Sequence, residues 1–184
     1  MPDLHIRIKR HADSSASITL TRADGSVTWQ RQRGQIGHVF PPHDITHYAV
    51  ETSLGYRQGF FGLVADGWEI ADFAAPWPRG PIPREAMEVE LIVGFFDAER
   101  RSAGQWSTQQ FNEQAVKYVS ASKHAATLTP PVLGDHDISR IRLARQEILE
   151  RWFATCAGNA LELTFDRAST PLASASTAPR PDQH

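Results

Sequence analysis

Apolar and polar side chains alternate in three successive stretches at the start of the chain, residues 4–9, 18–21 and 27–30. A period of two is typical of a β-strand that buries one face. The dipeptide Asp24-Gly25, between the second and third stretches, is typical of a tight hairpin turn. The sequence therefore predicts a three-stranded antiparallel β-meander, and the rest of the chain has to cover the apolar face of this sheet.

The remaining patterns predict helices and one more strand. Amphipathic stretches indicate helices at residues 83–100 and 107–124, and from residue 135 to a stop at Gly158. The alternation between residues 161 and 165 predicts a final strand that joins the meander. We therefore expect an α+β fold, in which an N-terminal antiparallel β-meander, joined by the C-terminal strand, packs against four or five helices.

Length and composition limit the domain organisation and the environment. We expect residues 1–167 to form a single domain, and residues 168–184, rich in Ala, Ser, Thr and Pro, to form a disordered tail. The single cysteine, Cys156, has no partner within the chain, and neither a membrane-spanning run nor a signal peptide pattern is present. These features favour a cytoplasmic protein. Because 19 basic residues face 21 acidic ones, we expect neither nucleic acid nor a membrane as a partner.

The segment at residues 40–51, Phe-Pro-Pro-His-Asp-Ile-Thr-His-Tyr-Ala-Val-Glu, concentrates the side chains best suited to chemistry. Which of these side chains share one helix face depends on where the helix begins. If Asp44 is the N-cap, His43 lies outside the helix. If Pro41 is the N-cap and Pro42 the first helical residue, three side chains share one face at i, i+4 and i+8: His43, His47 and Glu51. The sequence leaves both helix starts open.

Two imidazoles and one carboxylate are donors that bind zinc or ferrous iron. We expect a metal site with His43, His47 and Glu51 as ligands, with zinc preferred and iron as the alternative. Glu69, the nearest acid downstream, is a substitute for Glu51, because three ligands on one helix fit a tetrahedral ion poorly. Asp44 would be the catalytic general base, or would orient one imidazole. On this hypothesis the protein is a metal-dependent hydrolase.

The run from His43 to Glu51, followed by Gly-Phe-Phe-Gly at residues 59–62, resembles a group of bacterial proteins. That group shares a His-Asp-x-x-His-Tyr-x-x-Glu element and has no assigned activity. The His-Asp-x-x-His core also resembles the zinc motif of a ubiquinone-biosynthesis scaffold family, where a Glu follows after eleven residues; here that position is Gly59. Zincin proteases use His-Glu-x-x-His instead. Asp44 is one methylene shorter than that Glu and would hold a base farther from the attacking water.

A second hypothesis is a non-enzymatic binding or protein-interaction module in which the same helix start is structural. His47 and Tyr48 would then hydrogen-bond buried backbone groups, and the proline-rich loop at residues 74–83, with Trp77, would offer a surface. The partner would be an unidentified small molecule or protein, and the sequence leaves the oligomeric state open. No Gly-x-Ser-x-Gly elbow, Walker-type loop or dinucleotide fingerprint is present, so the sequence predicts none of those enzyme classes.

Overall fold

The structure is a computed structural model of the chain, and it describes residues 2–34, 36–102, 104–122 and 128–168. Most of the predicted disordered tail, residues 169–184, lies outside the described residues. The elements follow one another in this order: β1 (Leu4–Arg10), β2 (Ala16–Arg22), β3 (Val27–Gln32), α1 (Ile36–Leu54), α2 (Phe60–Ala65), the short 3₁₀ helix η1 (Ile70–Phe73), α3 (Arg84–Arg101), α4 (Thr108–Ala121), α5 (Asp135–Ala154) and β4 (Ala160–Phe165).

The sheet contains the predicted meander, and β4 joins it beside β1. Its strand order is β3-β2-β1-β4, and each neighbouring pair is antiparallel. Ile6 of β1 lies opposite Leu20 of β2 on one side and Leu163 of β4 on the other. Because these side chains share one face, the alternation seen in the sequence becomes a continuous buried surface. The predicted α+β fold is therefore confirmed.

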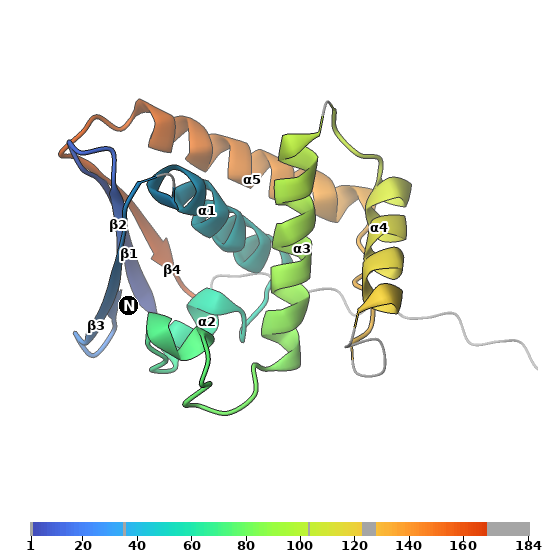
Figure 1. Cartoon of the computed structure of the whole chain (residues 1–184), viewed down its shortest axis with the longest axis horizontal. Helices are drawn as coiled ribbons and strands as arrows, with labels where there is room; N and C mark the ends of the chain where they lie inside the picture. Colours follow the sequence, from blue (N-terminus) through green and yellow to red (C-terminus); the bar gives the residue numbers. More distant parts are fainter. Residues whose placement is uncertain (1, 35, 103, 123–127, 169–184) are drawn as a thin grey trace, which may run out of the picture.

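Helix α1 is the element that joins the two halves of the core. Figure 1 shows it between the sheet and α3, with α5 running beside it and α4 beyond α3. Ile45 packs with the buried strand residues, α2 and α5. Ala49 and Val50 belong instead to a second cluster, which α1 shares with α3, α4 and α5. Helix α1 is therefore held in place by both core clusters, and so are the side chains on it that point toward α3.

Both predicted starts of α1 are wrong. The helix begins at Ile36 and runs through Pro41 and Pro42, so these residues are neither its N-cap nor its first position. Residues 36–39, which precede the two prolines, are also helical. Proline removes a helical hydrogen bond, but its fixed φ is compatible with a helix, and burial of the next two turns against both core clusters compensates. His43, His47 and Glu51, at positions i, i+4 and i+8, therefore all lie within the helix.

The other predicted helices agree with the structure, with small differences at their ends. Helix α4 is capped by Ser107, whose hydroxyl accepts a hydrogen bond from the Gln110 N–H. Helix α5 ends at Ala154, earlier than the Gly158 stop suggested. Among the described residues, no helix is both long and apolar enough to cross a membrane.

Candidate metal centre

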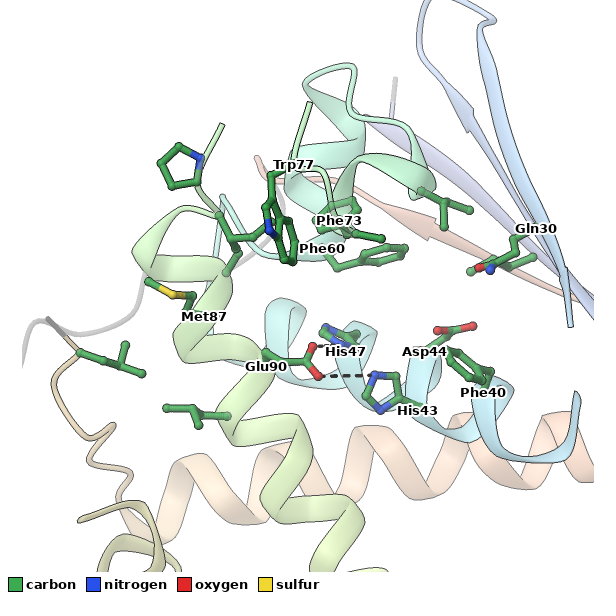
Figure 2. A pocket seen from close by; sticks show the side chains of 18 of the residues that line it. Gln30, Phe40, His43, Asp44, His47, Phe60, Phe73, Trp77, Met87 and Glu90 are labelled. Atoms are coloured by element: carbon green, nitrogen blue, oxygen red, sulfur yellow. Dashed lines mark ion pairs between the residues drawn. The ribbon is translucent and has the colours of Figure 1, made fainter. Parts of the chain in front are cut away.

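His43 and His47 lie one turn apart on α1 and point toward α3. Their ring centroids are 4.8 Å apart. The Nε2 atom of His47 is 3.1 Å from Oε2 of Glu90, and Nε2 of His43 is 3.9 Å from Oε1 of the same carboxylate. One ligand-capable atom from each of these three residues lies within 4.8 Å of the other two. Figure 2 shows Glu90 reaching from α3 to both rings.

Each histidine also has a carboxylate on the other side of its ring. Nδ1 of His43 is 2.9 Å from Oδ2 of Asp97, which lies two turns after Glu90 on α3. Nδ1 of His47 is 3.5 Å from Oε1 of Glu51. A carboxylate beside Nδ1 favours the tautomer that carries its proton there and leaves the Nε2 lone pair free. The Nε2 atoms of both rings, which would bind a metal ion, face Glu90.

Glu51 is fixed by the backbone of the next helix. Its side chain is fully buried, and its Oε2 atom accepts hydrogen bonds from the N–H groups of Phe61 at 3.0 Å and Gly62 at 3.4 Å. Gly59 leaves the space that this carboxylate occupies, because a Cβ atom there would lie 2.4 Å from Cδ of Glu51. The position that carries Glu in the ubiquinone-biosynthesis scaffold family is therefore packed directly against Glu51 in this chain.

The structure brings together part of the predicted ligand set. His43 and His47 meet as expected, whereas Glu51 lies behind the His47 ring and Glu90 faces its free nitrogen. The substitute ligand, Glu69, forms an ion pair with Arg22 at 3.0 Å and is not a member of the group. Two ligand-capable residues from one helix and one from another remove the difficulty of three ligands on a single helix.

Sequence reasoning missed Glu90 and Asp97, although their spacing carried a signal. They are seven residues apart on a predicted helix, so they fall on nearly the same face. Nothing in the sequence indicated that this face would lie against the histidines of α1. Two acids at this spacing beside an apolar stripe were the available clue.

Asp44, the predicted general base, lies beside the histidines on α1 and is buried. Gln32 of β3 is a hydrogen-bond partner of its carboxyl group, while the Oδ2 atom has no hydrogen-bond partner among the described residues. Burial raises the pKa of Asp44 to about 7, because the nearby histidines and Gln32 offset only part of the desolvation cost. A carboxyl group with a pKa near neutrality can both accept and release a proton.

The carboxylates also change the protonation of the imidazoles. Burial by itself would lower the pKa of His47, but Glu51 and Glu90 outweigh it and raise the pKa to about 10. The bond from His47 in turn lowers the pKa of Glu90. The two carboxylates therefore favour the protonated form of His47 in the metal-free site. A divalent cation would have to displace this proton, and it would restore the positive charge that the carboxylates attract.

A cavity of about 860 Å³ opens over this group of side chains. His43, Asp44, His47 and Glu90 lie on the side formed by α1 and α3, and Figure 2 shows Phe60, Phe73 and Trp77 opposite them. The proline-rich loop therefore lines the cavity, and it is irregular as predicted. The volume of the cavity falls within the range of small-molecule sites.

One feature expected of the non-enzymatic interaction module, in which the start of α1 is structural, is also present. The hydroxyl group of Tyr48 donates a hydrogen bond to the carbonyl of Thr164 in β4, at 2.8 Å. The ring nitrogens of His47 face carboxylates instead of backbone groups. Tyr48 thus joins α1 to the sheet, while His47 belongs to the polar cluster.

Comparisons of the chain with known protein families, with curated proteins and with solved structures find no match.

Proposed function

We propose that the protein is a metal-dependent hydrolase, in which His43, His47 and Glu90 hold one divalent cation. The observation that carries this proposal is the convergence of two Nε2 atoms on one carboxylate, with a separate carboxylate beside each Nδ1 atom. Each of the two rings lies between two carboxylates. Carboxylate-backed histidines of this kind are typical of metal ligands.

Zinc is the preferred ion and iron the alternative. Two imidazole nitrogens and one carboxylate oxygen are a common donor set of catalytic zinc sites, which keep a position open for water or substrate. The same donors also suit ferrous iron, so the ligands alone do not decide between the two ions. Around the two rings lie three carboxylates, from Glu51, Glu90 and Asp97, and this excess of negative charge favours a divalent cation.

The reaction we propose is hydrolysis of a carbonyl ester or amide. A bound divalent ion would supply Lewis acidity at this end of the cavity. In this proposal Asp44, which lines the cavity, accepts a proton from the attacking water, whose oxygen bonds to the carbonyl carbon, and returns the proton to the leaving group as the acyl bond breaks. The products are a carboxylic acid and an alcohol or amine, and no other reactant is needed.

The second candidate function is the non-enzymatic interaction module, which the bond from Tyr48 to β4 and the exposed Trp77 favour. It predicts that His47→Ala weakens the folded state of a protein that contains no metal. The hydrolase proposal predicts a loss of metal in the same variant.

The hydrolase is tested by cleavage of uncharged nitrophenyl esters by the zinc-loaded protein. We expect activity that a chelator abolishes and zinc restores. Asp44→Asn should keep its zinc but lower kcat by about 10² to 10⁴. Hydrolysis that a chelator leaves unchanged, or a zinc-loaded Asp44→Asn variant with full kcat, would contradict the proposal.

A further inference from the structure

We infer that the cavity takes an uncharged substrate with an aromatic or otherwise apolar body, whose carbonyl group faces His43, His47 and Glu90. This inference rests on the proposed hydrolase function and names the class of compound that it would cleave. Three features of the cavity support it: the chemistry of the walls, the charge of the lining residues and the position of the polar groups.

The walls are mainly apolar and include a group of aromatic rings. Phe60 packs against Phe73 with ring centroids 4.9 Å apart, and against His47 at 5.7 Å. Trp77 lies at the edge of the cavity and is 46% exposed. Aromatic walls of this kind favour ligands that bury rings or alkyl chains, since removing such groups from water drives their binding. Further apolar lining comes from Ile70, Ile82, Met87 and Leu91.

Among the described residues that line the cavity, histidine is the only basic side chain. Neither lysine nor arginine occurs among the described residues around the cavity, whereas Asp44 and Glu90 are acidic. Phosphate groups are usually held by arginine, lysine or several backbone N–H groups. In the metal-free protein an anionic ligand would meet two acids without these partners, so phosphorylated and multiply charged compounds fit the metal-free cavity poorly.

The polar groups gather on one side of the cavity. Figure 2 shows Asp44, His43, His47 and Glu90 along α1 and α3, opposite the aromatic rings, with Gln30 at the side nearest the sheet. A ligand with one polar end and one apolar end matches this division. Its carbonyl would point to the histidines and its ring or chain to Phe60 and Phe73. This orientation places the carbonyl carbon on the same side as Asp44.

The test uses binding of an uncharged fluorescent probe, N-phenyl-1-naphthylamine, to the metal-free protein and to the zinc-loaded protein. Two aryl compounds then compete with it: butyrophenone, an uncharged ketone, and phenyl phosphate, an anion. We expect saturable binding of one probe molecule per chain and displacement by butyrophenone. In the metal-free protein, phenyl phosphate should need a concentration at least about tenfold higher. Equal or stronger displacement by phenyl phosphate would overturn the inference.

A pair of matched variants locates the probe. Ile82→Asp places a charge in the cavity wall, and Val132→Asp makes a similar change at a loop residue that is 80% exposed and outside the cavity. We expect Ile82→Asp to weaken probe binding at least about tenfold, because a charge in an apolar wall is costly to desolvate. Val132→Asp should bind the probe normally. Equal effects of the two substitutions would show that the probe binds elsewhere, which contradicts the inference.

The zinc content of the same samples separates the two proposals. Both variants should keep their zinc, since neither residue belongs to the metal-capable group. Zinc-loaded wild-type protein that binds no uncharged probe would overturn the substrate class and leave the metal site standing. Probe binding in a protein that takes up no metal would overturn the hydrolase function and, with it, the role assigned to the carbonyl group.

Discussion

Glu90 faces His47 across the space between α3 and α1, with its Oε2 atom 3.1 Å from Nε2 of the ring. The two side chains differ greatly in exposure, since Glu90 is 63% exposed and His47 only 7%. An exposed carboxylate contributes little to the free energy of folding, but it can be a good metal ligand. The Glu90–His47 contact therefore allows the metal site and the fold to be tested separately.

Replacing Glu90 by alanine should remove a ligand at a moderate cost to the fold. In the metal-free protein we expect the free energy of unfolding to fall by about 1 kcal/mol, because Glu90 is exposed and the buried His47 keeps Glu51 beside its other nitrogen. Zinc affinity, measured by competition with a chromophoric chelator, should fall sharply. Unchanged zinc affinity would exclude Glu90 as a ligand.

Glu51 should behave in the opposite way. Glu51→Ala leaves the N–H groups of Phe61 and Gly62 without their acceptor and opens a cavity in the core. We expect a loss of about 2–4 kcal/mol in the free energy of unfolding of the metal-free protein, measured with urea. In folded protein, zinc affinity should fall about 10–100-fold, as when other orienting carboxylates are removed. Complete loss of zinc from a fully folded variant would instead make Glu51 a ligand.

Gly59 should be sensitive to a single added methyl group. Gly59→Ala places Cβ 2.4 Å from Cδ of Glu51, so it should destabilise the protein by about 1–3 kcal/mol in urea unfolding. Gly94→Ala is the matched control, because a Cβ atom there meets nothing within 4 Å and alanine favours the helix. In a Glu51→Ala background the Gly59→Ala substitution should cost much less. An equal cost in both backgrounds would place the strain elsewhere.

The ionisation of Asp44 should make the metal-free protein less stable as pH rises. Its folded-state pKa, about 7, lies above the unfolded value of 3.8, so the folded state retains the proton longer. The contribution of Asp44 to stability is full below the unfolded pKa and is lost as pH rises through the folded pKa. The Tm of Asp44→Asn relative to wild type should thus be higher at about pH 8 than at about pH 5. A pH-independent difference would contradict this.

Much of the fold could be predicted because the strands are regular. The alternation around Ile6, Ile18 and Leu163 reports directly which side chains are buried together. The start of α1 could not be predicted in the same way. Local preferences place a helix boundary at Pro41 and Pro42, whereas packing of α1 against both core clusters extends the helix beyond them.

The site was only half predictable for a related reason. The spacing of His43 and His47 places both rings on one helix face whichever helix contacts them. The third side chain depends on which helix packs there, and that is a property of the folded core. Glu51 had the correct spacing but points to the start of α2, and only the packing of α3 on α1 brings Glu90 to the rings.

The metal content of protein purified without a histidine tag decides whether His43, His47 and Glu90 hold an ion. We predict close to one zinc or iron ion per folded chain in the wild type, and its loss in His43→Ala and His47→Ala. His136→Ala, an exposed histidine at the start of α5, should keep the metal. Wild-type protein that contains no metal, takes none up from added zinc or iron and is as stable with the ion as without it would contradict the account.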